Sequence, residues 1–257
     1  MTSNENRLQG FKRASAKSLN PRLIVTEKSK QKENNLFLVL GLMRNDLSDL
    51  IDLHDLFIEA TPPPQPKISA ENGIYSGKII YMDRLLLSHL YEILIFFKKN
   101  PHFENIPEMR LIFKSLSNDE RKRWQRLKLM SECVESISLI ESSNFDDDTK
   151  EILELTQRTR HNTYHYWNAE KILREGFRDF FFNMENPGNK HAYYVDEKNA
   201  ATDRSLYVDV AAEVGLTKNK KFLRNPVIRE HLLELMKEVA VFLNVVISEY
   251  HQYLKKR

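Results

Sequence analysis

The sequence predicts an all-α protein, a bundle of long antiparallel helices, and three observations support this fold class. Only seven of the 257 residues are glycine, which is below the usual share of about 7% and leaves few residues suited to tight hairpin turns. Apolar residues recur at intervals of three and four over long stretches. These stretches end at prolines or polar clusters, which stop helices. An all-β sandwich, collagen and Gly/Ser-rich low complexity are therefore excluded.

The first two long helices are predicted over 34–60 and 76–99. The first has an inward stripe of Leu36, Leu40, Met43, Leu47, Leu50, Leu53 and Phe57. Prolines 62–64 and 66 follow and disfavour helix, so 61–73 is predicted to be a surface loop. The second helix has a stripe of Ile79, Met82, Leu86, Leu90, Ile93 and Phe97, and it ends at Asn100-Pro101.

Two further helices are predicted in the middle of the chain. A short one covers 107–116. A capping box, Ser117-Asn118-Asp119-Glu120, then begins a helix that is predicted to run to about 141. Its early turns carry basic residues around Trp124, which form either a solvated helix face or a phosphate-contacting face. These residues are Arg121, Lys122, Arg123, Arg126 and Lys128.

The second half of the chain combines helices with one irregular insertion. The acidic break Asn144–Asp148 precedes a helix that runs from about 147 into the 160s, with Ile152 and Leu155 inward. An apolar stretch covers 169–182, and a small irregular insertion covers 186–224. The last helix is predicted over 226–254, with Pro226 near its first turn. Its inward stripe is Leu232, Leu235, Met236, Val239, Leu243, Val246 and Tyr250.

Composition limits the compartment and the class of partner. The formal charge is only +3, which does not by itself indicate nucleic-acid binding. A single cysteine, Cys133, predicts a reducing, cytoplasmic compartment, and no apolar run is long enough to span a membrane. Residues 1–33 hold eight Lys/Arg and three acids. They are predicted to be a basic, partly disordered arm, either solvated or holding a polyanion, and 34–257 a single helical domain.

Several familiar catalytic motifs are absent. Gly73-Ile74-Tyr75-Ser76-Gly77-Lys78 superficially looks like a phosphate loop. It has one residue too few between the glycines, and no Ser or Thr follows the lysine. The sequence also lacks a Gly-rich dinucleotide turn, an H-E-x-x-H pair, a Cys pair and a Gly-x-Ser-x-Gly elbow.

The segment from Arg158 to Trp167 concentrates chemistry-bearing side chains. It reads Arg158-Thr159-Arg160-His161-Asn162-Thr163-Tyr164-His165-Tyr166-Trp167. Histidine titrates near neutral pH and can exchange a proton, and arginine forks onto a phosphate. Metal-free RNA cleavage requires this combination, because a base removes the 2′-hydroxyl proton, a cation stabilises the phosphate and an acid protonates the leaving oxygen.

This segment resembles the Arg-x(4–6)-His motif of the HEPN superfamily, all-helical proteins that include many prokaryotic ribonuclease toxins and phage-defence effectors. Arg160 to His165 satisfies the four-residue spacing, and Arg158 to His165 satisfies the six-residue spacing. Arg160 is favoured because the polar His161 follows it. His165-Tyr166, Gly176-Phe177 and Phe180-Phe181 are also similar to members of the superfamily, and the resemblance covers roughly 34–182.

The resemblance implies a metal-independent endoribonuclease without cofactor, acting as a toxin or phage-defence effector. His165 would be the acid/base, Arg160 or Arg158 the phosphate cation, and His161 and Asn162 supporting groups. Tyr164 and Tyr166 would contact the RNA substrate, and the cleaved end would be a 2′,3′-cyclic phosphate. It also implies a homodimer with a composite active site, held in check by an antitoxin or another restraint. Trp167 stands where the antitoxin-paired subgroup carries a tyrosine, so tyrosine modification is not carried over.

Two alternatives and one geometric question remain open at this level. The chain could be a catalytically inactive helical module for dimerisation or RNA binding. It could also be a metal-dependent hydrolase that uses His161 and His165, which have metal-ligand spacing on a helix. On an ideal helix Arg160 and His165 lie about 140° apart. Either the helix is therefore interrupted near 160–163, or Arg158 is the working cation.

Overall fold

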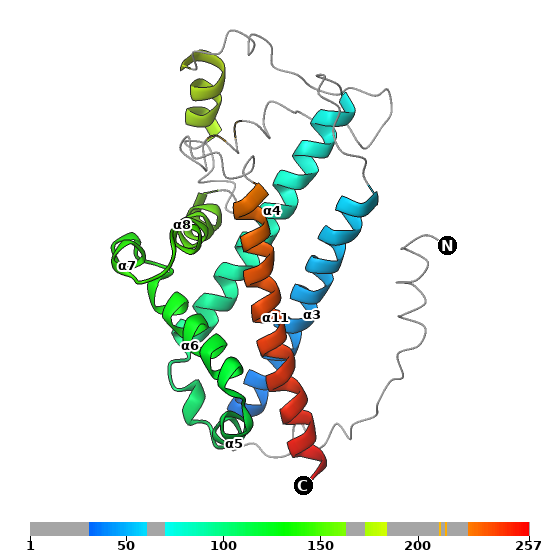
Figure 1. Cartoon of the computed structure of the whole chain (residues 1–257), viewed down its shortest axis with the longest axis vertical. Coiled ribbons are helices and arrows are strands. Elements are labelled where there is room, and N and C mark those ends of the chain that lie inside the picture. The colour runs from blue at the N-terminus through cyan, green and yellow to red at the C-terminus, as the bar shows by residue number, and fades with distance from the viewer. Residues whose placement is uncertain are drawn as a thin grey trace.

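The computed structural model describes residues 31–60, 70–162, 173–183, Ala211, Val214 and 226–256. All regular elements in these ranges are helical, which confirms the predicted all-α class. Three 30-residue helices form the frame: α3 (Gln31–Ala60), α4 (Ala70–Lys99) and α11 (Pro226–Lys255). Figure 1 shows that α3 runs antiparallel to both α4 and α11. None of the described helices is long and apolar enough to cross a membrane.

The shorter helices cover the side of the frame opposite α3 (Figure 1). In chain order they are η2 (Phe103–Asn105), α5 (Pro107–Ser115), α6 (Asn118–Cys133), α7 (Ile137–Ser142) and α8 (Asp147–Asn162). The long helix α11 packs along α3, and α4 packs against both α6 and α8. This arrangement places α8, which carries the start of the predicted site, directly on α4.

The core follows the predicted apolar stripes closely in α4, α8 and α11. Every residue assigned to the inward stripes of α4 and α11 is buried, and so are Ile152 and Leu155 of α8. Trp124 of α6 anchors one end of the core, where its ring lies 5.2 Å from Phe97 and 5.4 Å from Phe242. Its indole nitrogen donates to Glu104 at 2.7 Å, so the buried polar atom is satisfied.

The predicted loop over 61–73 is too long at its C-terminal end. Helix α4 begins at Ala70, so 70–73 are helical, and 61–69 lie outside the described residues. The Gly73–Lys78 segment is therefore part of a regular helix and forms no phosphate loop. Helix α3 begins at Gln31, three residues before its predicted start.

The helix predicted from 117 to about 141 is two helices. The capping box at Ser117 and Glu120 is present, but α6 ends at Cys133 and α7 begins at Ile137. The Ser136 hydroxyl accepts the Leu139 amide at 3.4 Å and caps the new helix. A side-chain cap therefore starts a new helix at a place where the apolar spacing alone predicted one continuous helix.

One inward position of α3 is occupied by histidine and not by the predicted leucine. Leu53 is 53% exposed, whereas His54 is 4% exposed. A helix turns about 100° per residue, so His54, seven residues after Leu47, stays in line with it. Leu53, six residues after Leu47, is rotated by about 120°. The three-residue step from Leu50 thus leads off the core face.

The apolar stretch over 169–182 is helical from residue 173 onward, where the structure describes it. Residues 173–178 are helical, and η3 (Asp179–Asn183) continues as a π-helix. Phe177 packs against Phe181, with ring centroids 4.6 Å apart. The insertion predicted over 186–224 lies outside the described residues, apart from Ala211 and Val214.

Candidate functional site

The predicted site begins on α8, and the structure describes this helix but not the whole site. The backbone is helical through Arg158, Arg160, His161 and Asn162. The side chains of the last three lie outside the described residues, and so do Tyr164, His165 and Tyr166 as a whole. The described part of the chain therefore shows how the helix beneath the site is held and what surrounds Arg158.

Helix α8 begins at a strong side-chain cap. The carboxylate of Asp146 accepts the Thr149 amide at 2.7 Å and the Thr149 hydroxyl at 2.8 Å. Partial burial raises the pKa of Asp146, but these hydrogen bonds, together with His231, outweigh it and hold that pKa below its usual range. Asp146 is therefore ionised at neutral pH, and its negative charge lies at the helix N-terminus, where the helix dipole favours it.

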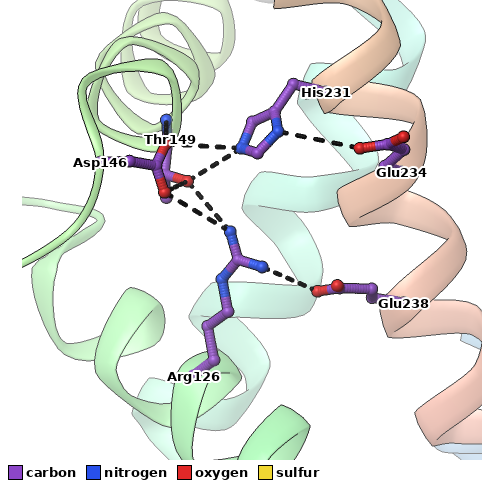
Figure 2. A network of polar contacts seen from close by, with 6 residues as sticks. All are labelled: Arg126, Asp146, Thr149, His231, Glu234 and Glu238. Carbon is purple, nitrogen blue, oxygen red and sulfur yellow. Dashed lines mark hydrogen bonds and ion pairs between the residues drawn. The ribbon is translucent and has the colours of Figure 1, made fainter.

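The Thr149 hydroxyl joins this cap to two other helices (Figure 2). Arg126 of α6 donates to it at 3.0 Å, and Nε2 of His231 on α11 lies 3.0 Å away. A hydroxyl has one proton and two acceptor lone pairs. Since the proton goes to Asp146 and one lone pair accepts Arg126, the remaining lone pair accepts His231, which places a proton on Nε2.

The same network continues along α11. The other terminal nitrogen of Arg126 donates to Glu238 at 3.0 Å, and Nδ1 of His231 lies 4.0 Å from the carboxylate of Glu234. Figure 2 shows the six side chains spanning the space between α6, α8 and α11. The N-terminus of α8 is thus fixed by groups from two neighbouring helices.

The order Thr149, His231, Glu234 looks like a nucleophile, a base and an orienting acid, but the geometry does not support catalysis. Thr149 is fully buried, and its hydroxyl proton is directed to Asp146. The cavity next to the network, lined by Arg123, Arg126, Glu238 and apolar side chains, measures about 10 Å³, which is room for one water. This network is therefore an anchor for α8 and not a reaction centre.

The inner face of α8 is fixed against α4. Ile152, Leu153, Leu155, Thr156 and Thr159 are buried. The buried Thr156 hydroxyl donates back to the Ile152 carbonyl at 2.7 Å, so its burial leaves no unpaired hydroxyl. Capped at its start and packed along its length, α8 is a fixed support for the segment that follows it.

Arg158 is paired within the helix. Its guanidinium lies 3.5 Å from the carboxylate of Glu154, one turn earlier, and both side chains are largely shielded from solvent. The structure thus places Glu154 beside Arg158. The helix is also unbroken as far as Asn162, so an interruption between Arg160 and Asn162 is excluded.

Three of the five basic side chains on the predicted face of α6 bind other parts of the protein. Arg121 donates to the carbonyls of Leu116 and Lys114 at 3.1 and 3.2 Å. Lys128 binds Glu104 at 3.1 Å, and Arg126 belongs to the network of Figure 2. These contacts favour the interpretation of these residues as a solvated helix face around Trp124 over a phosphate-contacting face.

The remaining candidate groups have structural surroundings. Cys133 is half-buried; burial, followed by the neighbouring Glu132, raises the pKa of its thiol, which therefore stays protonated at neutral pH. Asp46 of α3 and Glu92 of α4, whose carboxylates could orient a catalytic group, are exposed. Among the described residues no group of three His, Cys, Asp or Glu is arranged to hold a metal ion.

Besides the Thr149 network, the structure contains a buried ion pair that the sequence patterns did not predict. Asp83 of α4 is fully buried, and Arg229 of α11 binds its carboxylate at 3.1 Å. Burial raises the pKa of Asp83, and Arg229 and then His54 oppose the rise. Asp83 and Arg229 are 146 residues apart, so no local spacing could have indicated the pair.

Comparison of the chain with protein-family models, curated proteins and solved structures finds no match.

Proposed function

We propose that the protein is a metal-independent endoribonuclease that cleaves RNA by attack of the 2′-hydroxyl on the adjacent phosphate. One observation carries the proposal. The Arg158–Trp167 segment begins on a helix that is capped, cross-linked to α6 and α11 and packed on α4 in an all-helical bundle. Catalytic side chains need such a fixed support, because small displacements of reacting groups cost large factors in rate.

The reaction assigns a role to each candidate residue. His165 exchanges the protons, Arg160 stabilises the charge on the phosphate, and His161 and Asn162 support them. The 2′-oxygen forms a bond to phosphorus as the bond to the 5′-oxygen breaks, which leaves a 2′,3′-cyclic phosphate and a 5′-hydroxyl. No metal ion is needed, because arginine and histidine supply the cation and the proton.

The described contacts of Arg158 support Arg160 as the working cation. The Glu154 carboxylate, 3.5 Å away, already offsets the charge of Arg158. A guanidinium with a carboxylate partner binds a phosphate less strongly, since the phosphate must compete with that partner. Arg158 is then a positioning residue that stiffens the last turns of α8.

The proposal includes a biological role and partners. A nuclease of this type would be a toxin or phage-defence effector that acts as a homodimer, because a two-fold axis brings two copies of the segment into one cleft. An antitoxin or another restraint would keep it inactive until needed. Tyr164 and Tyr166 would stack on unpaired bases of the RNA substrate.

Cleavage of a labelled single-stranded RNA by the full chain tests the proposal. His165→Ala and Arg160→Ala are expected to lower the cleavage rate at least ~100-fold, the usual effect of losing a general acid/base or a charge-stabilising group. Matched controls are His102→Ala and Arg110→Ala, which alter exposed residues far along the chain from the segment. They should cleave at the wild-type rate. Excess EDTA should have no effect, and the product should carry a cyclic phosphate.

Other outcomes would contradict the proposal in distinguishable ways. Full activity of His165→Ala would remove the proposed acid/base. Activity lost in EDTA and restored by zinc would favour a metal-dependent hydrolase that uses His161 and His165. Absence of cleavage by wild-type protein on unstructured and structured RNA alike would favour an inactive helical module.

A further inference from the structure

The face of α3 that points away from the bundle has an unusual order of side chains. Apolar residues lie near both ends, with Leu38 49% and Leu42 60% exposed at one end and Leu53 and Leu56 at the other. Exposed acids lie between them: Asp46, Asp49 and Asp52. The opposite face of α3 packs against α11 and α4. We call the exposed side the outer face of α3.

The spacing on the outer face is that of a helix-contacting stripe. Positions 38, 42, 45, 49, 52 and 56 alternate steps of four and three, which keeps them in line along one side of a helix. Exposed leucines scattered singly need no explanation, but Leu38, Leu42 and Leu56 share one stripe, as the apolar residues of a helix-contacting surface do. The acidic centre further indicates that whatever covers this stripe is basic in its middle.

A second copy of α3 does not fit this requirement. In a parallel two-fold pair, Asp49 and Asp52 would face the same residues of the other copy. In an antiparallel pair centred on the stripe, Asp52 would face Leu42. Either arrangement places carboxylates against each other or against an apolar side chain, and both are unfavourable.

Residues 1–30, which directly precede α3, have the complementary order. Leu8 and Phe11 lie at one end, and Leu19 and Leu23 at the other. Between them are three basic residues: Lys12, Arg13 and Lys17. We propose that this segment docks in the same chain on the outer face of α3, with its basic centre on Asp46, Asp49 and Asp52.

The lengths allow an antiparallel arrangement. Leu38 and Leu56 are 18 helical residues apart, or about 27 Å. Leu8 and Leu23 are fifteen residues apart in sequence and reach this distance without full extension. Residues 24–30 are then long enough to reverse the chain, since helix–helix connections of two to eight residues are common. Leu19 and Leu23 would meet the start of α3, and Leu8 and Phe11 would meet Leu53 and Leu56.

Docking would give the basic segment a role that differs from that of a free polyanion-binding arm. Lys12, Arg13 and Lys17 would be occupied by carboxylates of the same chain. An RNA or another polyanion would then have to displace the acids of α3 before it could bind these residues. This docking depends on the outer face of α3 and not on the proposed nuclease activity.

Hydrogen–deuterium exchange of the full chain tests the proposal. Amides within 8–23 of the wild type should exchange at least ~10-fold more slowly than in an unstructured peptide, as expected for docked backbone. Asp49→Lys with Asp52→Lys should remove this protection, and so should Lys12→Glu with Lys17→Glu. All four substitutions together should restore it, because the charges are then exchanged between the two surfaces. Glu132→Lys with Glu141→Lys, which reverses two exposed acids on α6 and α7, is the matched control and should leave protection unchanged.

Three results would overturn the proposal. The first is exchange of 8–23 at the unstructured rate in the wild type. The second is equal protection in the wild type and in Asp49→Lys with Asp52→Lys. The third is protection that falls on dilution, which would place the segment on a second copy. The substituted acids are exposed, and helical circular dichroism checks that each variant is folded.

Discussion

Nε and Nη2 of Arg229 both lie 3.1 Å from the same carboxylate oxygen of Asp83. The pair joins the start of α11 to the middle of α4. A fully buried carboxylate is stable there only because a guanidinium compensates its charge. The two long helices are thus held in register by a contact that apolar stripes alone would not specify.

Replacement of one member of this pair should lower the free energy of unfolding much more than replacement of both members. We expect Asp83→Leu to lower the free energy of unfolding by about 3 kcal/mol, because it deprives a largely buried Arg229 of its carboxylate. Asp83→Leu combined with Arg229→Met should recover most of the loss, since the isolated charge is gone. Urea unfolding measures both values, and a double variant as unstable as the single one would contradict the expectation.

Asp83 should also make the stability of the protein depend on pH, and the sign of this dependence follows from its raised pKa. Burial raises the pKa of Asp83 above the 3.8 of an unperturbed aspartate, against the opposing effects of Arg229 and His54. As pH rises through 3.8, the unfolded chain ionises first and the folded protein holds the proton longer. The contribution of Asp83 to stability is therefore greatest below the unfolded pKa and falls until pH passes the folded pKa.

Asp83→Asn is the reference for this measurement. The free energy of unfolding of the wild type minus that of Asp83→Asn, followed from about pH 3 upward, should decrease as pH rises and then level off. A difference that increases with pH would show that the Arg229 contact lowers the pKa more than burial raises it.

Thr149 should be sensitive to loss of its hydroxyl and not to loss of its methyl group. Thr149→Val removes the donor to Asp146 and the acceptor of Arg126 and His231. We expect a loss of about 2 kcal/mol in unfolding free energy, because the hydroxyl that joins three partly shielded partners at the start of α8 is lost. Thr149→Ser keeps the hydroxyl and should lose markedly less. Equal losses in the two variants would show that packing, and not the network, fixes the start of α8.

The features that were predicted correctly from the sequence depend on residues close together in the chain. The inward stripes of α4 and α11 were predicted correctly because the spacing of apolar residues reports directly which side of a helix faces the core. The same rule failed at Leu53, where a leucine and a histidine one residue apart competed for the inward position. It also failed at Ser136, whose hydroxyl starts α7 within a run of apolar spacing that does not break.

Contacts between distant residues could not be anticipated. The hydroxyl of Thr149 meets residues 23 and 82 positions away, and no periodicity connects such positions. Within the candidate site, the pairing of Arg158 with Glu154 has the i, i+4 spacing of helix ion pairs and was accessible from sequence.

Mixing of two inactive variants tests whether the proposed site is shared between subunits. If both segments meet in one cleft at a two-fold axis, a dimer of one Arg160→Ala chain and one His165→Ala chain retains one intact arginine and one intact histidine. We expect cleavage to recover partly after the two variants are co-refolded, to a rate well above that of either alone. Arg160→Ala mixed with the double variant Arg160→Ala/His165→Ala is the matched control. It supplies no Arg160 in any dimer, so it should stay inactive. No recovery in the first mixture, with mixed dimers verified by native mass spectrometry, would show that each subunit needs its own complete segment.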